Sequence, residues 1–480
     1  MRNALILVGL LSTGSALYAC SSDPAPATPS DGGTEAATTD GGKADAKNDG
    51  GTGPGSSCAN PIPADLGTQI DGAFTAEGQS VYYSVKVTPG DFMVISADTE
   101  ATADTESTVV DTAISVFDAT GAKLLAADDD AFPRVSTAAS LDYKIPAGTT
   151  ALCVQVTDFD TWSGGTPKLA ADPSFKFFAG KIDTAAEVVT FDAEPNDTTA
   201  AAQAGKLKAF TTPPGAYNYI FGTLKDAADV DVFKFTVPTG ATSVSVEVPP
   251  IGAPLQSGKS SYGSTMARFT ATIKKADGTI VSELAPPAGQ VEKMSGSLSS
   301  PVEPGDYFLA ISRPAGIAPG ANDFYSSFIS FGTSNPAEAE TTSGGNDTIA
   351  TAQALTMTTS KTDPKVKDGY ILAHLPTGDT LDNFSFPVGN GDKVSVACSA
   401  ARDGSGLQAF KVELFVDGVS KQSETETATA DVAWSAGTGA SKPAVAITAA
   451  GTAVLQLSAG SVSNTNTGTY YLCGVHVAAP

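Results

Sequence analysis

Histidine is almost absent from this chain of 480 residues. Only His374 and His476 occur, far apart in the sequence, and neither has an adjacent serine or cysteine to act as a nucleophile. The patterns His-Glu-x-x-His, Gly-x-Ser-x-Gly and Gly-x-x-x-x-Gly-Lys-Ser/Thr are also absent. We therefore expect a protein that is not an enzyme. A glycan hydrolase that uses two carboxylates stays open as an alternative, because acidic residues are plentiful.

Basic residues are scarce as well. The chain has 28 Lys and Arg against 52 Asp and Glu, which gives a net charge of −24 and an isoelectric point near 4.3. A surface of this sign repels phosphate backbones, so nucleic acid is excluded as a partner. The same surface attracts divalent cations.

Long apolar runs are missing too. The run at residues 4–11 is far shorter than the ~20 residues of a membrane-spanning helix. It follows Arg2 and precedes small residues, an order typical of a secretory signal over residues 1–19. The tetrapeptide Leu-Tyr-Ala-Cys at 17–20 resembles the lipobox of bacterial lipoproteins, which implies that Cys20 bears lipid. An ordinary signal peptide with a chance cysteine is the alternative.

The segment after Cys20 contains no large apolar side chain. Residues 21–57 include no Leu, Ile, Val, Phe, Tyr or Trp. Such a segment cannot bury enough apolar area to offset the entropy of ordering its backbone. We expect residues 20–57 to be a disordered tether, rich in Gly, Asp, Pro and Thr, that holds a folded region away from a membrane.

Four cysteines follow the tether: Cys58, Cys153, Cys398 and Cys473. An even number in an exported protein predicts two disulfides, for which three pairings exist. Sequence position favours Cys58–Cys153 and Cys398–Cys473, because each pair then stays within one part of the chain. Four free thiols are the alternative.

The chain beyond the tether repeats itself three times with a period near 150 residues. Each copy has a leading Ile, then an aromatic-x-apolar-x-Val-x-x-Gly strand that begins thirteen residues later, at Tyr83, Phe233 and Phe384. A closing strand is expected at residues 148–153, 305–310 and 468–473. Alternating strands and frequent turns predict antiparallel β-sandwiches, with short helical pieces at 198–204 and 348–355. The expected domains are residues 58–190, 191–336 and 337–480.

The middle copy carries a recognisable series of motifs. Asp-Ala-Glu-Pro-Asn-Asp-Thr stands at 192–198, Ile-x-Gly-x-Leu at 220–224, and Asp-x-Asp-x-Phe-x-Phe-x-Val-Pro-x-Gly at 229–240. These motifs resemble the bacterial pre-peptidase C-terminal domain, a family that includes the collagen-binding modules of clostridial collagenases. The resemblance covers residues 58–480. It implies an all-β protein of three tandem jelly-roll-like sandwiches, usually appended to secreted proteases, with calcium bound near the Glu-Pro-Asn-Asp segment in some members.

Calcium prefers six to eight carboxylate and carbonyl oxygens. In the middle copy these would come from the segment beside Pro195 and from the strand that the family places next to it. The candidate ligands are Glu194, Asn196, Asp197, Asp229 and Asp231. The alternative is that these residues only form turns and a helix cap.

A second acidic run, residues 128–130, is interpreted as a solvated hairpin loop. The alternative is a cation site completed by Asp111 or Asp118. Six aromatic residues are interpreted as core residues, with exposed platforms for a polymer as the alternative: Trp162, Trp434, Tyr217, Tyr219, Tyr262 and Tyr325.

These patterns together predict a lipid-anchored protein of the bacterial envelope, facing the surface or the periplasm. Ser21 after Cys20 is compatible with sorting to the outer membrane. The modules are expected to have a binding or a structural role. The expected partner is collagen, a polysaccharide or an envelope protein, and calcium is the expected stabiliser. The rivals are a glycan hydrolase and an accessory partner of a separately encoded protease.

Overall fold

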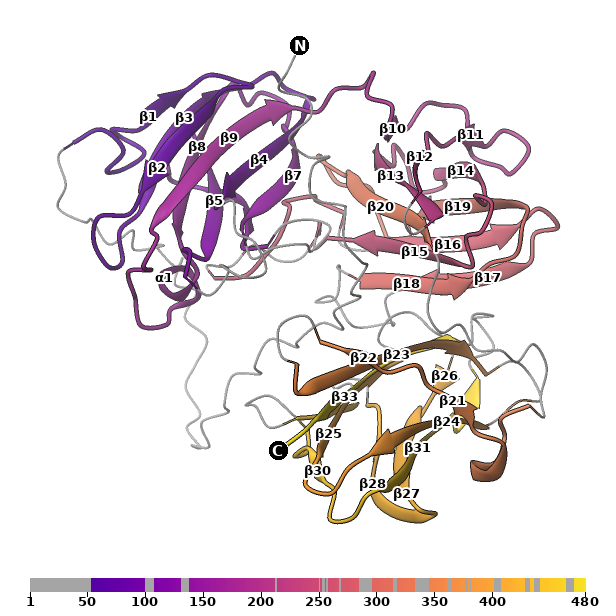
Figure 1. Ribbon diagram of the computed structural model, residues 1–480. Coiled ribbons are helices and arrows are strands. Elements are labelled where there is room, and N and C mark those ends of the chain that lie inside the picture. The colour runs from indigo at the N-terminus through magenta and orange to yellow at the C-terminus, as the bar shows by residue number, and fades with distance from the viewer. Residues whose placement is uncertain are drawn as a thin grey trace, which may run out of the picture.

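In the computed structural model the chain folds into three consecutive β-sandwiches, which we call modules 1, 2 and 3 (Figure 1). Modules 1 and 2 lie side by side, and module 3 lies below them in this view. The structure describes residues 53–99, 108–130, 138–211, 214–249, 251–252, 255, 258–266, 269–284, 296–313, 317–332, 345–360, 364–375, 379, 381–400, 407–427, 432–435, 441–462 and 470–480. The signal segment, Cys20 and most of the tether lie outside these ranges.

Each module consists of two facing sheets. The order of strands in one sheet is β1-β3-β8-β5-β6 in module 1, β11-β14-β19-β16-β17 in module 2 and β21-β24-β31-β27-β28 in module 3. In module 1 the elements are β1 (Ile62–Ala64), β2 (Gln69–Ala73), β3 (Val81–Lys86), β4 (Phe92–Asp98), β5 (Thr112–Asp118), β6 (Leu124–Asp128), β7 (Ser140–Lys144), β8 (Ala151–Asp158), α1 (Phe159–Ser163) and β9 (Ser174–Lys181).

The second sheet also repeats, as β2-β9-β4-β7, β13-β20-β15-β18 and β23-β33-β25-β29. In module 2 the strands are β10 (Val189–Phe191), β11 (Gln203–Ala204), β12 (Lys208–Thr211), β13 (Pro214–Gly222), β14 (Val230–Thr236), β15 (Ser243–Val248), β16 (Thr270–Lys275), β17 (Ile280–Leu284), β18 (Gly296–Pro301), β19 (Asp306–Ser312) and β20 (Tyr325–Gly332).

Module 3 adds a two-stranded pair, β26 with β32, to the same plan. Its elements are the 3₁₀ helix η2 (Ile349–Thr351), β21 (Gln353–Ala354), β22 (Thr358–Thr359), β23 (Val366–His374), β24 (Leu381–Val388), β25 (Lys393–Ser399), β26 (Leu407–Gln408), β27 (Lys411–Val416), β28 (Val419–Thr425), β29 (Val432–Trp434), β30 (Val445–Ala446), β31 (Gly451–Ser458), β32 (Ser461–Val462) and β33 (Tyr470–Ala478).

The prediction of an all-β protein with tandem antiparallel sandwiches is confirmed. Alternation along the strands explains it, because every second side chain points into the space between two sheets. The repeated aromatic is fully buried at the same place in each module, at Tyr83, Phe233 and Phe384. Four short pairs are parallel: β1 with β3, β10 with β13, β11 with β14, and β21 with β24.

The two disulfides are Cys58–Cys153 and Cys398–Cys473, the pairing favoured by position. They are not equivalent, however. Cys153 lies in β8, whereas Cys473 lies in β33, the counterpart of β9 and β20. The prediction that residues 468–473 are equivalent to residues 148–153 and 305–310 is therefore wrong. The strand equivalent to β8 and β19 is β31. Both stretches alternate in the same way, so the pattern alone did not separate them.

Two predicted boundaries shift. The tether was expected to extend to residue 57, but Gly55 is buried and its carbonyl accepts a hydrogen bond from the Tyr82 amide at 3.0 Å. The boundary between residues 190 and 191 falls inside β10, which pairs with β13 of module 2. The expected helical pieces are reduced to η2, because β11 and β21 occupy the ends of both segments.

Modules 1 and 2 share one continuous hydrophobic core, which the prediction of three separate sandwiches did not include. Phe92 of β4 reaches from module 1 into module 2. Its ring centroid lies 5.5 Å from that of Phe191, 5.6 Å from Phe221 and 5.8 Å from Phe324. Module 3 has a separate core.

A segment of module 2, residues 258–266, also packs against module 1. We call it the strap. Ser261 exchanges two backbone hydrogen bonds with Ala127 at the edge of the β6 strand, at 2.7 and 2.8 Å. Ser260 donates to Asp129 at 2.6 Å, and the Tyr262 hydroxyl donates to the Ser140 carbonyl at 3.2 Å. The strap therefore covers a sheet edge that would otherwise present unpaired backbone groups.

Among the described residues, no helix is long and apolar enough to cross a membrane.

Candidate metal centre

Acidic side chains from two segments meet at one end of module 2. The first segment, residues 192–197, follows β10, and the second, residues 223–229, joins β13 to β14. We call the second segment the cation loop. Because β10 pairs with β13, the two segments leave the sheet side by side. Ligand atoms of Glu194, Asp197 and Asp229 all lie within 4.8 Å of one another.

Three buried oxygen atoms at this place accept no hydrogen bond. They are Oδ1 of Asn196, Oδ1 of Asp229 and Oδ1 of Asp231. The three residues are at most 3 % exposed. A buried acceptor without a partner costs about 1–3 kcal/mol, so such atoms need an explanation. A cation bound beside Glu194, Asp197 and Asp229 would supply such an explanation.

The remaining polar atoms of these side chains are held by the protein. Asp231 Oδ2 accepts a hydrogen bond from the Tyr325 hydroxyl at 2.5 Å. Asp229 Oδ2 accepts from the backbone amide of Lys225 at 2.5 Å. The side-chain amide of Asn196 donates to Asp192 Oδ1 at 3.0 Å. These contacts leave the second carboxylate oxygen of Asp231 and of Asp229, and the single amide oxygen of Asn196, without a donor.

Lys225 provides the positive charge at the centre. Its ammonium group forms an ion pair with Glu194 and lies 3.7 Å from Asp229 Oδ1. The Lys225 side chain is 55 % exposed, so the ammonium group can move into solvent when another cation arrives. An alternative is that the cluster is complete as an internal ion-pair network. The partnerless oxygen of Asn196 argues against that alternative, whereas Asp231 lies within hydrogen-bond reach of Asp192.

Burial and mutual repulsion shift the titration of these groups. Burial raises the pKa of Asp231 to about 8, with further contributions from Asp192, Asp229 and Glu194. Burial also raises the pKa values of Asp192 and Asp229. The hydrogen bond from Lys225 lowers the pKa of Glu194. Without a metal ion the centre therefore retains protons that a divalent cation would displace.

These shifts predict how stability depends on pH. An acid whose pKa is raised by folding stabilises the fold below its unfolded pKa, and this contribution is lost as the pH rises through the folded pKa. With Asp231 near 8, the chelator-treated protein should lose stability between about pH 4 and pH 8. The slope is at most about 1.4 kcal/mol per pH unit for each such group.

Urea unfolding across this pH range, with and without calcium, measures the effect. Calcium should flatten the profile, because coordination favours the ionised carboxylates. A chelator-treated protein whose stability rises steadily from pH 4 to pH 8 would contradict the assignment.

Module 3 repeats part of the arrangement. Asp382 occupies the place of Asp231, and its Oδ2 accepts a hydrogen bond from the Tyr471 hydroxyl at 2.6 Å. Oδ1 of Asp347 and Oδ2 of Asp379 are buried and accept no hydrogen bond. Gly344 stands in the sequence where Glu194 would fall, so one carboxylate fewer is available.

Module 1 lacks the arrangement. The strand registers place Val81 where modules 2 and 3 have Asp231 and Asp382. They also place Phe175 where the other modules have tyrosines. The acid and its hydroxyl partner have thus been replaced together by apolar residues. The sandwich architecture therefore does not require the Asp–Tyr pair.

The structure brings three of the five predicted ligands together, namely Glu194, Asp197 and Asp229. The other two, Asn196 and Asp231, are buried, as is Asp229, whereas Glu194 and Asp197 are exposed. The sequence analysis did not assign Asp192, Lys225 or Tyr325 to the metal centre. Asp192 carried a signal, as the first residue of the motif at 192–198. The role of Tyr325 depends on a strand about a hundred residues away.

The acidic run of module 1 was expected to be a solvated hairpin loop, and this interpretation is wrong. Asp128 is 5 % exposed and lies under the strap, and Asp111 faces Asp129 and Asp130. Burial raises the pKa of Asp111 to about 8. Asp118 lies apart from this run, at the turn after β5, where it accepts hydrogen bonds from the Thr120 hydroxyl and amide.

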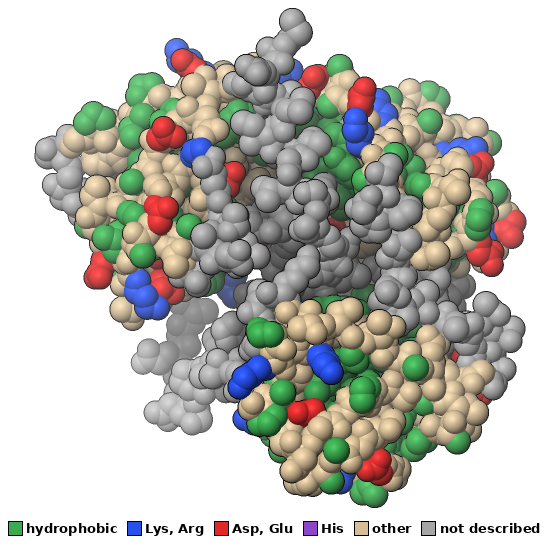
Figure 2. Space-filling view, viewed as in Figure 1, with side chains coloured by type: hydrophobic (Ala, Val, Ile, Leu, Met, Phe, Trp, Pro, Cys, Tyr) green, Lys and Arg blue, Asp and Glu red, His purple; other side chains and the backbone are tan. Residues whose placement is uncertain are grey.

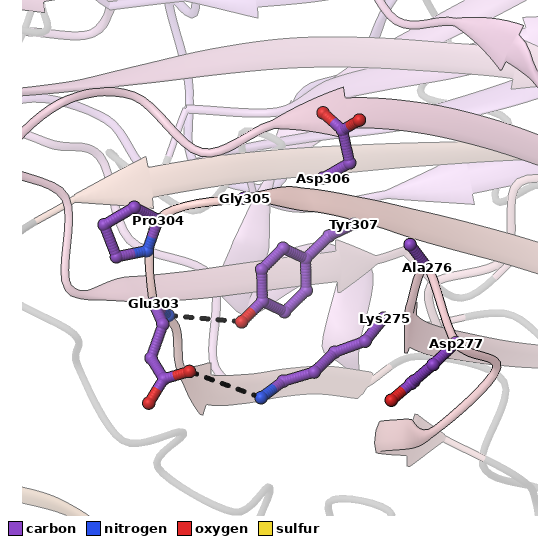
Figure 3. Close-up of a pocket in the computed structure, with 8 residues that line it drawn as sticks. All are labelled: Lys275, Ala276, Asp277, Glu303, Pro304, Gly305, Asp306 and Tyr307. Atoms are coloured by element: carbon purple, nitrogen blue, oxygen red, sulfur yellow. Dashed lines mark hydrogen bonds and ion pairs between the residues drawn. The ribbon is translucent and has the colours of Figure 1, made fainter.

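A shallow cavity of about 310 Å³ lies at the other end of module 2 (Figure 3). Lys275 and Glu303 form an ion pair across its mouth at 3.5 Å. A hydrogen bond from the Thr279 amide lowers the pKa of Asp277, and the bond from Lys234 lowers that of Asp306. A glycosidase needs a carboxyl group whose pKa is raised so that it can donate a proton. Asp277 and Asp306 do not meet this requirement.

The six aromatic residues weighed as binding platforms are buried, which confirms their interpretation as core residues. His476 faces outward with its side chain 40 % exposed, and its Nδ1 lies 2.6 Å from Asp368. The side chain of His374 lies outside the described part of the structure. The exposed large hydrophobic residues of the described chain are scattered over all three modules. On the face that Figure 2 shows, charged side chains of both signs are dispersed among hydrophobic ones.

No protein-family model and no curated protein sequence matches the chain. Among solved structures, it is similar to tandem family 51 carbohydrate-binding modules of a family 98 glycoside hydrolase from Streptococcus pneumoniae (13 % identity, 56 % of this chain and 84 % of that chain, TM-score 0.17). It is also similar to the CUB1-EGF-CUB2 segment of human MASP-1/3 (9 % identity, 55 % and 98 %, TM-score 0.15). A third is the triple jelly roll of an archaeal virus (9 % identity, 86 % and 89 %, TM-score 0.16).

Proposed function

We propose that the chain is a non-catalytic display protein of the bacterial envelope, whose modules are stabilised by a divalent cation of the calcium type. Three buried oxygens without hydrogen-bond partners, together with a cluster of three carboxylates, carry the cation part of the proposal. Glu194, Asp197 and Asp229 would provide the outer ligands, and Asn196 and Asp231 the inner ones. When bound, calcium supplies only fixed positive charge, and no reaction step is assigned to it.

The donor set fits calcium better than zinc or copper. All the candidate ligands are oxygens, with no histidine or free thiol among them, whereas zinc and copper sites rely on nitrogen and sulfur. Magnesium demands a stricter octahedral geometry and retains its waters, so a mixed cage of carboxylates and one amide suits calcium.

Export to the envelope is supported by the sequence and by the disulfides. Both bridges need an oxidising compartment to form and persist. The signal segment and the lipobox resemblance at Cys20 support a lipid anchor, preferably in the outer membrane, and the tether supports display at a distance. Membrane fractionation of a Cys20→Ser variant tests this part. Release of that variant from membranes, with the unchanged chain retained, is the expected result.

A binding role is supported by the threefold recurrence of one sandwich scaffold. The partner class that we favour is an extracellular polymer, because the exposed hydrophobic residues of the described surface are scattered and form no protein-binding patch. Sedimentation with insoluble glycans, collagen fibrils and envelope fragments tests the partner. Binding to an envelope protein alone would favour the alternative of an accessory module.

Thermal unfolding in calcium and in chelator tests the cation part of the proposal. Extracellular modules bind calcium with dissociation constants of about 0.1–1 mM. At about 10 mM calcium a site of ~0.1 mM affinity stabilises the folded state by ~2.7 kcal/mol. That corresponds to a rise in melting temperature of about 5 °C or more for a unit of this size. Identical melting curves in calcium and in chelator would sink the proposal.

A further inference from the structure

Arg313 is a buried cation outside the candidate metal centre. It follows β19, and its guanidinium group has no exposed surface. Arg313 Nη1 donates to the backbone carbonyl of Asp226, and Nη2 donates to that of Leu224 at 2.6 Å. Both carbonyls belong to the cation loop, which carries Lys225 and Asp229. A planar guanidinium that binds two carbonyls of one loop fixes the path of its backbone.

The charge of Arg313 is balanced from the opposite side. Asp323, whose side chain is 3 % exposed, accepts a hydrogen bond from Arg313 Nη2. The same carboxylate accepts the Gly320 amide at 2.8 Å and the Thr265 hydroxyl at 2.6 Å. Removing one partner of such a pair is strongly destabilising, since the other charge stays buried. Arg313 and Asp323 therefore act as a unit.

Thr265 connects this unit to the strap. Its hydroxyl accepts a hydrogen bond from the Asn322 amide at 2.8 Å, and its own amide donates to the Asn322 carbonyl at 3.1 Å. The Asn322 side chain then donates to the carbonyl of Lys144 in module 1 at 3.2 Å. The polar contacts thus run without a break from module 1 to the cation loop.

Further hydrogen bonds and ring contacts run beside this series of polar contacts. Ser264 of the strap donates to the Phe324 carbonyl at 2.7 Å and accepts from the Phe324 amide at 3.0 Å. The Phe324 ring packs against Phe92 and Tyr143 of module 1. The strap, Arg313 and the junction, by which we mean the contact between modules 1 and 2, are therefore fixed relative to one another.

We propose that Arg313 is the positioning residue of the cation loop and that it couples this loop, through Asp323 and Thr265, to the junction between modules 1 and 2. The predicted effect on calcium affinity rests on the proposed cation site, whereas the positioning of the loop by Arg313 does not. Cation binding then stiffens the junction, and a loosened junction weakens cation binding by the same factor, because coupling between two sites is reciprocal.

Two variants of the full chain test the proposal. Thr265→Val removes one hydroxyl of the chain of contacts without exposing a charge. Arg313→Lys keeps the charge but cannot hold both carbonyls in a fixed fork. The matched control is Thr236→Val, which removes a hydroxyl that donates to Asp306 at 2.7 Å in the same module, outside the chain of contacts.

The first measurement is hydrogen exchange in chelator, which needs no calcium site. Both variants should exchange faster than the unchanged chain in the cation loop and in the strap, and the control should not. The proposal is overturned if Thr265→Val accelerates exchange in the strap alone. It is also overturned if neither segment changes in either variant. Should Arg313→Lys loosen all of module 2, the milder Thr265→Val decides.

The second measurement is calcium affinity by calorimetry. Affinity should fall about threefold in Thr265→Val and about tenfold in Arg313→Lys, in keeping with the loss of one or two hydrogen bonds. Unchanged calcium affinities in both variants would contradict the proposed coupling but would not contradict the proposed cation site. If calcium does not bind to the unchanged chain, the proposed cation site is contradicted. The hydrogen-exchange measurement would then still test whether Arg313 positions the loop.

Discussion

Replacement of Phe92 by alanine is expected to lower the free energy of unfolding of modules 1 and 2 by about 3–5 kcal/mol. Phe92 is 8 % exposed, although its place in β4 puts it on the outer face of its own sandwich. Its surroundings are the rings of Phe191, Phe221 and Phe324 from module 2. The cavity left by the missing ring therefore lies in the shared core, and both modules lose packing.

Calorimetry of the full chain measures this effect. We expect two unfolding transitions, one for modules 1 and 2 together and one for module 3, because these are the two hydrophobic cores. Phe92→Ala should shift only the first. Leu414→Ala, at a fully buried position of module 3, is the matched control and should shift only the second. Three independent transitions, with Phe92→Ala affecting module 1 alone, would show that the shared core does not unite the modules.

Replacement of Asp231 by asparagine is expected to abolish most of the stabilisation by calcium. Asparagine keeps an oxygen that can accept the hydrogen bond from Tyr325, so the architecture should survive. It removes one negative charge from the centre of the site, and carboxylates are the strongest ligands that calcium has in proteins. In chelator near neutral pH the variant should melt at or above the temperature of the unchanged chain. Burial raises the pKa of Asp231 to about 8, so folding has to protonate this carboxylate, whereas asparagine is already neutral.

Melting curves of three variants separate this effect from a general change of charge. Asp306→Asn removes a carboxylate at the far end of module 2 and should keep the full response to calcium. Asp382→Asn tests the partial site of module 3 and should leave the response of modules 1 and 2 intact. A normal calcium response of Asp231→Asn would mean that the buried oxygens are not ligands.

Lys225 offers a test of opposite sign. Its ammonium group neutralises Glu194 and Asp229 when calcium is absent, and it repels an arriving cation. Lys225→Gln should therefore raise the calcium affinity. A lower affinity would indicate that the ion pair is needed to shape the loop.

Much of the architecture could be predicted from the sequence because it depends on local alternation. The strand that begins at Tyr83, Phe233 and Phe384 has the same pattern in every module, and each of these rings is buried. The pairing of the disulfides also followed, since Cys58–Cys153 and Cys398–Cys473 each close within one module. Neither conclusion required knowledge of which strands are neighbours.

What could not be predicted depends on contacts between distant segments. The shared core arises because Phe92 points out of one sandwich and into another, and alternation does not tell an exposed outer face from a covered one. The equivalence of β31 with β8 and β19 needed the order of strands in the sheet. The pairing of Asp231 with Tyr325 needed the register of β13 with β20.

The candidate metal centre lies between these extremes. Glu194, Asn196 and Asp197 are neighbours in the sequence, so their convergence in one turn was predictable. That Asp231 is buried, with an oxygen that accepts no hydrogen bond, is a property of the folded state alone. The strongest argument for a cation is therefore one that only the structure supplies.

Calorimetric titration of calcium into the chelator-treated chain near neutral pH tests the central claim most directly. We predict saturable binding, a release of protons that varies with the ionisation heat of the buffer, and loss of this site in the Asp231→Asn variant. A titration without binding heat in two buffers of different ionisation enthalpy, at calcium concentrations up to about 10 mM, would contradict the claim.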